Sequence, residues 1–204
     1  MISQIFTSLL AAVCIITPVT ATPVSATDID LSKVKYNGIL SRGGQGCDQQ
    51  HPAAVSINGA AVGLVESFPQ FTASYKSGDA VDKQRQFCQV AIDISYPDGL
   101  QYRVKEVTVI DSARISEGAS AIHDITLYFG GSTDQSTVSK TITGPVANNA
   151  IPSTNVISNK VWSPCNESQY LNIKNAARIN AGTSKDKNSV SIKYVVFGLE
   201  WRRC

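Results

Sequence analysis

Few residues in this sequence combine the types and spacing that a catalytic site needs. His123 and Asp124 are the only adjacent histidine and aspartate, and such residues together can orient a general base. Neighbours on a strand point to opposite faces, however, so these two side chains are badly placed to bond to each other. His123 lies in an alternating apolar run, and we expect a core or edge histidine. His51 stands beside Pro52 in a polar segment, where we expect a solvated side chain.

The cysteines indicate cross-links rather than a metal site. The uncharged N-terminal run IFTSLLAAVCII has the length of a signal-peptide core, and its removal takes Cys14 away. An even set of cysteines then remains in an oxidising compartment, which predicts two disulfides. No cysteine or histidine spacing fits zinc, so we expect no metal and no cofactor. Four cysteines allow three pairings, and we favour the sequential one, which joins Cys47 to Cys88 and Cys165 to Cys204.

The N-terminus predicts export. Small residues at the usual spacing offer cleavage after Ala21 or after Ala26, and we favour the first. The sequence thus predicts a signal peptide over residues 1–21, an extended solvated lead-in over 22–36 and one domain over 37–204. No later apolar run is long enough to span a bilayer. We therefore expect a secreted, extracellular protein whose mature chain has no membrane anchor.

Net charge and motifs exclude several function classes. Lys and Arg number 18 against 16 Asp and Glu in 204 residues, so the clustered basic charge typical of nucleic-acid binders is missing. The sequence contains no phosphate-binding loop and no nucleophile elbow. We therefore expect a protein that is not an enzyme. A carboxylate pair brought together from distant strands would escape such a search, which keeps an extracellular hydrolase as a further alternative.

The elements that must position any site are strands. Apolar and polar residues alternate with period two along much of the chain, whereas helical periodicity is almost absent. Residues 90–96 alternate in this way, Pro97-Asp98-Gly99 is typical of a tight turn, and the run from Leu100 is predicted to return as the second arm of a hairpin. The parity of the apolar residues changes in that arm, which predicts a β-bulge near Lys105-Glu106.

The same alternation predicts the remaining strands. About ten strands exceed what one open sheet usually carries, so we predict an all-β fold, an antiparallel two-sheet β-sandwich resembling a jelly roll. A short helical turn is expected only around Ser112–Ala119. The further predicted strands cover residues 54–57, 68–75, 121–129, 138–143, 156–162, 171–173, 177–179 and 190–201.

Several short pieces occur in an order and spacing that together resemble one family. The pieces are GCDQQHPAAVSI, YPDGLQY, LYFGG, WSPC, LNI and the closing WRRC. In them the chain resembles the secreted domain of unknown function numbered 4360, found mostly in fungi and in some bacteria. It departs from the usual pattern at Asp48, Leu100 and Asn166. The resemblance implies secretion and a β-rich fold, and because the family has no established activity it adds no catalytic residue.

Aromatic residues near the last two cysteines are the candidate binding residues. Trp162 and Trp201 each lie three residues before a cysteine, so pairing of those cysteines brings both indoles near one bridge. We expect the rings to cover a buried disulfide, and the alternative for Trp162 is an exposed platform for sugar rings. Tyr170 is flanked by polar residues and is the better exposed candidate.

Asn166-Glu167-Ser168 fits the N-glycosylation sequon. The sequon follows a disulfide cysteine in a polar stretch, where a glycan would be accessible. In a eukaryotic source we expect a glycoprotein modified at Asn166.

The leading functional hypothesis is a secreted binding module associated with cell-wall or extracellular polysaccharide. It follows from export, a β-rich fold, weak net charge and the lack of recognisable catalytic motifs. The main alternative is a protein-interaction factor, either an inhibitor or a host-directed effector, that contacts an extracellular protein through its loops.

Overall fold

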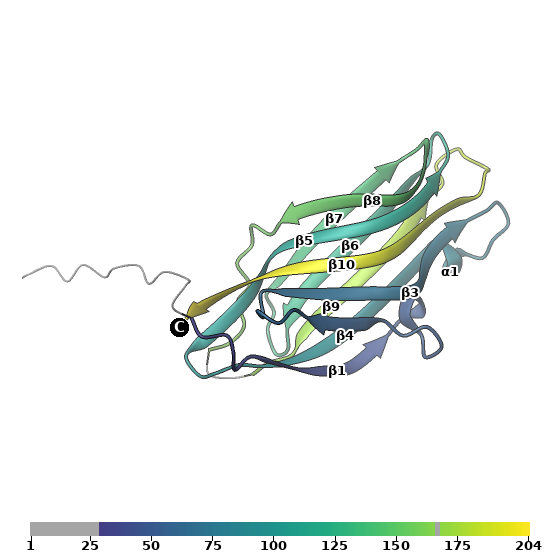
Figure 1. The fold of residues 1–204 in the computed structure, drawn as a ribbon. Helices are drawn as coiled ribbons and strands as arrows, with labels where there is room; N and C mark the ends of the chain where they lie inside the picture. Colours follow the sequence, from purple (N-terminus) through teal and green to yellow (C-terminus); the bar gives the residue numbers. More distant parts are fainter. Residues whose placement is uncertain (1–28, 166–167) are drawn as a thin grey trace, which may run out of the picture.

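The computed structural model describes residues 29–165 and 168–204 and confirms the predicted two-sheet β-sandwich. Figure 1 shows one sheet lying over the other. Sheet A has the order β1 (Lys35–Gly43), β4 (Arg85–Ser95), β9 (Leu171–Asn180), β6 (Ser120–Phe129) and β7 (Gln135–Thr143). Sheet B has the order β2 (Ala54–Ile57), β3 (Gly63–Tyr75), β10 (Asn188–Arg203), β5 (Leu100–Ile115) and β8 (Val146–Val156). Two short helical segments, η2 (Gln45–Cys47) and α1 (Val81–Gln84), lie in the connections.

The predicted hairpin from β4 into β5 is wrong. The tight turn exists, with the Leu100 N–H donating to the Pro97 carbonyl at 3.3 Å. However, β4 pairs with β1 and β9, whereas β5 pairs with β10 and β8. The turn therefore carries the chain from sheet A to sheet B. Alternation predicts that each strand buries one face. The alternating pattern does not show whether two successive strands pair in one sheet or face each other across the core.

The predicted β-bulge in β5 is confirmed. Val104 pairs with Leu199 and Glu106 with Gly198, so Lys105 is the extra residue between them. The bulge reverses the parity of the strand, and the apolar residues on both sides of it face the core.

Several predicted boundaries are wrong. β1 has no counterpart among the predicted strands, and β8 ends at Val156, where a strand over 156–162 was expected. Both are edge strands with many exposed residues, which weakens their apolar alternation. The expected helical turn around Ser112–Ala119 is a continuation of β5 and a turn. The two segments 171–173 and 177–179 form one strand, β9, interrupted in sequence by a polar residue at a core position.

The lead-in predicted to be solvated contributes to the domain. Ile29, Leu31 and Val34 are partly buried against the core, and β1 begins at Lys35, within the predicted lead-in. The predicted signal peptide over 1–21, both cleavage points and the sequon residue Asn166 lie outside the described residues.

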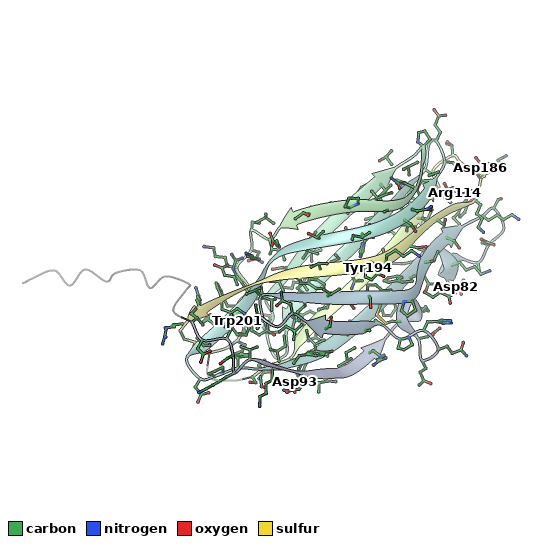
Figure 2. The ribbon with its side chains drawn as sticks, viewed as in Figure 1. Asp82, Asp93, Arg114, Asp186, Tyr194 and Trp201 are labelled. Carbon is green, nitrogen blue, oxygen red and sulfur yellow. A yellow bond between two sulfur atoms is a disulfide. The ribbon has the colours of Figure 1, made fainter. Side chains whose placement is uncertain are left out.

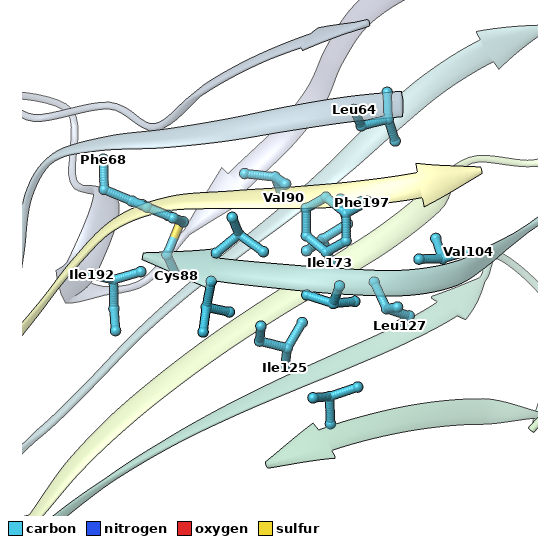
Figure 3. Close-up of a cluster of buried hydrophobic side chains, with 14 of the residues drawn as sticks. Leu64, Phe68, Cys88, Val90, Val104, Ile125, Leu127, Ile173, Ile192 and Phe197 are labelled. Carbon is cyan, nitrogen blue, oxygen red and sulfur yellow. The ribbon is translucent and has the colours of Figure 1, made fainter. Parts of the chain in front are cut away.

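The core lies between the two sheets. Figure 3 shows side chains from both layers, such as Val104 of β5 and Leu127 of β6, filling this space. Alternate residues along each long strand are buried there. Each Å² of apolar surface that this removes from water stabilises the fold by about 25 cal/mol. The sandwich thus has a continuous apolar interior with few positions for polar groups.

Two disulfides tie the sandwich together in the sequential pairing. Cys47 in η2 is bonded to Cys88 in β4 with a Cα–Cα distance of 5.3 Å, and both residues are buried. Cys165 is bonded to Cys204 with a Cα–Cα distance of 6.1 Å, and Cys204 is exposed. The first bridge belongs to the core, whereas the second fastens the chain end at the surface.

Candidate functional site

Five polar residues, each on a different strand, occupy core positions and are linked to one another by contacts. Each shares the parity of buried apolar neighbours on its own strand, so its side chain is directed between the sheets. We call these residues the buried polar chain. They are Glu66 on β3, Asp111 on β5, His123 on β6, Lys140 on β7 and Asn175 on β9.

One half of the buried polar chain is joined by Asn175. Its Nδ2 donates to Glu66 Oε2 at 2.8 Å, and its Oδ1 lies 3.1 Å from His123 Nε2. An amide oxygen only accepts, so the proton in the second contact belongs to His123 Nε2. Asn175 thereby fixes the orientation of the imidazole and connects it to a carboxyl group on the other sheet.

The other half is a set of contacts around Asp111. His123 Nδ1 lies 3.3 Å from Asp111 Oδ1, and Lys140 Nζ lies 3.1 Å from Asp111 Oδ2. Both contacts are at ion-pair distance. Their geometry does not make either of them a hydrogen bond, so the Asp111 oxygens and His123 Nδ1 have no hydrogen-bond partner among the described residues. Lys140 Nζ also donates to the Ile151 carbonyl of β8 at 2.6 Å. Charged groups from both sheets therefore meet inside one edge of the sandwich.

Burial changes the protonation of Glu66 in the buried polar chain. Burial raises the pKa of Glu66 from 4.5 to about 8, against the opposing effect of the hydrogen bond from Asn175. Glu66 is therefore mainly protonated at neutral pH. Its Oε1 has no hydrogen-bond partner within the described part of the chain.

The buried polar chain is closed to substrates. Glu66 and Asp111 are 0% exposed and His123 is 2% exposed, so a molecule in solvent cannot reach their functional atoms. His123 is thus a core residue, as expected. Asp124, its sequence neighbour, bonds Arg178 on the outer face of sheet A at 2.7 Å. His51 lies at the surface, where its ring contacts Asp48 at 3.3 Å.

The two tryptophans have different environments. Trp201 is buried, donates from Nε1 to the Ala61 carbonyl at 2.7 Å, and lies near the C-terminal end of β10 (Figure 2). Trp162 is half-buried, and the Arg202 guanidinium lies 3.9 Å from its ring centroid. The expectation that both rings cover a buried disulfide is wrong, because the Cys204 end of that bridge is exposed.

Tyr170 is exposed, as the sequence predicts, and its ring has one packed side. Its exposed fraction is 42%. A Cβ placed on Gly130 would come within 2.7 Å of the ring, so the ring packs closely on that glycine. The backbone supports this contact, because the Gly130 N–H donates to the Tyr170 carbonyl at 2.9 Å.

Sequence analysis missed a groove on the outer face of sheet A, which we call the Phe87 groove. Phe87 is 37% exposed, and its pairing partner on β9 is Ala176, whose small side chain leaves space beside the ring. Lys174 Nζ lies 5.5 Å from the ring centroid. The groove has a volume of about 440 Å³ and is lined by Gln45, Asp82, Arg85, Phe87, Lys174 and Ala176.

The polar surface continues along sheet A beyond the groove. Gln89, two residues after Phe87 and on the same face of β4, donates from Nε2 to the Tyr128 hydroxyl of β6 at 2.9 Å. An aromatic residue at an outward position was the sequence signal for this surface, because Phe87 has the opposite parity to Cys88 and Val90. The groove combines an apolar ring with charged and amide groups, and such a set can bind a ligand with both apolar and hydroxyl surfaces.

A curated protein and a solved structure are among the proteins that are similar to this chain. An "Uncharacterized secreted protein" of Arthroderma benhamiae is 29% identical over 184 residues, which are 86% of this chain and 74% of the relative. The structure of TmCBM61 in complex with β-1,4-galactotriose aligns with a TM-score of 0.35 and 10% identity, over 82% of this chain and 91% of that chain. A TM-score this low gives that likeness no weight for fold or function.

The relative agrees with the predicted export, since it is described as secreted. In the described part of the chain, no helix has the length and apolar character needed to cross a membrane. The family model described as "Domain of unknown function (DUF4360)" matches residues 34–204, which is most of the sequence and includes the pieces that carried the resemblance. This chain therefore belongs to the DUF4360 family.

Proposed function

We propose that this protein is a secreted, non-enzymatic binding module that associates with cell-wall or extracellular polysaccharide through the Phe87 groove. The observation that carries the proposal is the exposed Phe87 ring in a groove lined by charged and amide side chains. An aromatic face packs well against the C–H face of a sugar ring, and the surrounding polar groups can bond its hydroxyls. The closed interior of the sandwich supports the non-enzymatic part of the proposal, because it keeps the histidine and carboxyl groups there out of contact with solvent.

The groove is shaped by rigid elements. Phe87 lies one residue before Cys88, whose disulfide holds β4 against η2. Asp82 comes from α1 and Gln45 from η2, so two connections place polar groups beside a ring that the sheet holds in position. A binding surface that is preformed in this way loses little conformational entropy when a polymer binds.

The aromatic residues predicted from sequence remain proposed secondary contacts. Tyr170 is the better of the two, because its exposed fraction of 42% leaves part of the ring available to a ligand. Trp162 is the weaker one, because Arg202 stacks on its ring at 3.9 Å and would have to move for a sugar to use that face.

The test compares two aromatic truncations on opposite faces of the sandwich. Purified protein is incubated with insoluble chitin and insoluble β-glucan, and the bound fraction is released with soluble oligosaccharide. The wild type is expected to be retained, and Phe87→Ala to lose affinity by roughly tenfold or more, the usual effect of removing a central aromatic contact. Tyr194→Ala is the matched control, because Tyr194 is 50% exposed on the outer face of sheet B (Figure 2).

Three results would count against the proposal. Wild-type protein that stays in the supernatant with every polysaccharide would remove it. Equal retention of the wild type and Phe87→Ala would show that polysaccharide does not bind at the Phe87 groove. Specific co-purification of an extracellular protein, without binding to polysaccharide, would favour the interaction factor instead.

A further inference from the structure

Lys140 and Asp111 are opposite charges placed together inside the sandwich. Lys140 lies on β7, an edge strand of sheet A, and Asp111 lies on β5 of sheet B. The Lys140 Nζ to Asp111 Oδ2 distance is 3.1 Å, and the side chains are 9% and 0% exposed. The contact therefore joins the two sheets across the core, next to the edge strands β7 and β8.

Such a pair is expensive as a purely electrostatic contact. Two charges taken out of water lose their hydration, and well-packed apolar residues at the same positions are often as stabilising or more so. The two side chains are nearly closed to solvent, and the packing of the two sheets holds them close together. Fixed proximity raises the effective concentration of one group near the other by several orders of magnitude.

We propose that Lys140 and Asp111 condense to an intramolecular amide that covalently joins the two sheets. Transfer of one proton from the ammonium to the carboxylate gives a neutral amine and a carboxylic acid. The Nζ lone pair attacks Cγ of Asp111, so that the Nζ–Cγ bond forms while the Cγ–Oδ1 bond breaks. Oδ1 leaves as water, with one proton from the acid and one from Nζ, and Oδ2 becomes the amide oxygen. The reaction needs no oxidant and no co-reactant.

In this proposal His123 carries the proton, because it lies beside the oxygen that leaves. Its Nδ1 lies 3.3 Å from Asp111 Oδ1, the oxygen that leaves. Its Nε2 is held at 3.1 Å from the Asn175 amide oxygen, which keeps a proton on that side of the ring and leaves Nδ1 for proton transfer. In this arrangement Nδ1 takes a proton from the attacking nitrogen and returns it to Oδ1.

The bond would reinforce the part of the sandwich that the disulfides do not reach. Cys47–Cys88 joins η2 to β4, and Cys165–Cys204 joins the segment after β8 to the chain end. Among the described residues, neither bridge includes a residue of β7 or β5. An amide from Lys140 to Asp111 would tie β7 to the opposite sheet and would survive reducing conditions.

Peptide mass spectrometry of the purified full-length secreted protein tests the proposal. Trypsin does not cleave after a lysine whose Nζ is part of an amide. After reduction and alkylation, the wild type is expected to yield a branched peptide that joins residues 106–114 to residues 115–160, lighter than the sum of its parts by one water. Lys140→Arg and Asp111→Ala are expected to yield separate peptides, because a guanidinium is a poor nucleophile and alanine has no carboxyl group.

The wild type alone decides the outcome. Complete cleavage after Lys140, with unmodified peptides on both sides of it, would overturn the proposal whether or not any variant folds. His123→Asn tests the proton carrier, and it is expected to lower by at least about tenfold the rate at which newly synthesised, folded protein loses water, followed by mass from the start of expression. An unchanged rate in a folded His123→Asn protein would overturn that role of His123.

Discussion

The two ends of the space between the sheets are filled by different kinds of side chain. At the end near the C-terminus, Tyr96, Tyr102, Phe129 and Trp201 form an aromatic cluster with ring centroids 4.9–5.6 Å apart. Farther along β5 and β6, Asp111 and His123 belong to the buried polar chain. The aromatic cluster gains stability from buried apolar area and from ring contacts. The polar chain loses hydration, and its contacts offset that loss only in part.

The aromatic cluster also explains the WSPC segment. Ser163 is buried, and its hydroxyl accepts from the Tyr102 N–H at 3.0 Å and from the Tyr96 hydroxyl at 3.1 Å. The Tyr96 hydroxyl also lies 3.0 Å from the Pro164 carbonyl. The segment is therefore held against the core by hydrogen bonds, a structural role for residues that the sequence marks as a motif. The aromatic end therefore holds a surface segment against the core, whereas the buried polar chain has no such stabilising role.

The largest expected effect comes from breaking the aromatic end. Trp201→Ala removes a buried ring that packs on Tyr96 and Tyr102 and donates to the Ala61 carbonyl. We expect the free energy of unfolding to fall by about 3–5 kcal/mol, measured by urea unfolding at fixed pH. A loss below about 1 kcal/mol would show that this end contributes little to stability.

An intermediate effect is expected at the polar end, as a dependence of stability on pH. The folded pKa of Glu66 is about 8 and the ordinary value is 4.5, so the folded state binds more protons than the unfolded state between these values. The contribution of Glu66 to stability is then fully present below pH 4.5, falls as the pH rises through this window, and is lost above pH 8. The slope gives a loss of about 3 kcal/mol between pH 5 and pH 7.5.

Glu66→Gln is the control for that pH dependence. The neutral amide keeps the size of the side chain and cannot ionise, so denaturant midpoints measured across this pH range should show a flatter profile than the wild type. If the two proteins lose stability in parallel, another group is responsible and the described state of Glu66 is wrong.

The smallest expected effect on the free energy of unfolding is at Tyr102, in the aromatic cluster. The Tyr102 hydroxyl is buried and has no hydrogen-bond partner in the described part of the chain, and burial raises the pKa of Tyr102 well above its ordinary value. Tyr102→Phe removes an unpaired polar group and is expected to change the free energy of unfolding by less than about 1 kcal/mol, toward greater stability. A clear loss in thermal unfolding would indicate that the hydroxyl has a partner, such as a bound water.

Much of the fold was predictable because alternating apolar residues mark the buried face of each strand in the sequence. β2 was predicted with correct bounds, and the bulge at Lys105 followed from a change of parity. The partners of each strand were not predictable, because alternation does not say which strand pairs with which. The error at Pro97–Gly99 is of this kind, since a turn between two half-buried strands is compatible with a hairpin and with a change of sheet.

The candidate site was harder to predict for the opposite reason. Asp111 and Asn175 interrupt apolar faces at core positions, and Phe87 interrupts a polar face, so each carries a local signal. That signal says only that a residue is unusual for its face. Which unusual residues meet is decided by how the strands pair and by how the two sheets face each other. Asn175 on sheet A and Glu66 on sheet B meet across the core although 109 residues separate them in sequence.

The central claim is that function lies on the outer face of sheet A and not in the closed interior. Retention on insoluble polysaccharide, measured side by side for Phe87→Ala and Glu66→Gln, tests it most directly. We expect Glu66→Gln to bind as the wild type does, whereas Phe87→Ala is not retained on the polysaccharide. Normal binding by Phe87→Ala together with loss of binding by a folded Glu66→Gln would contradict it.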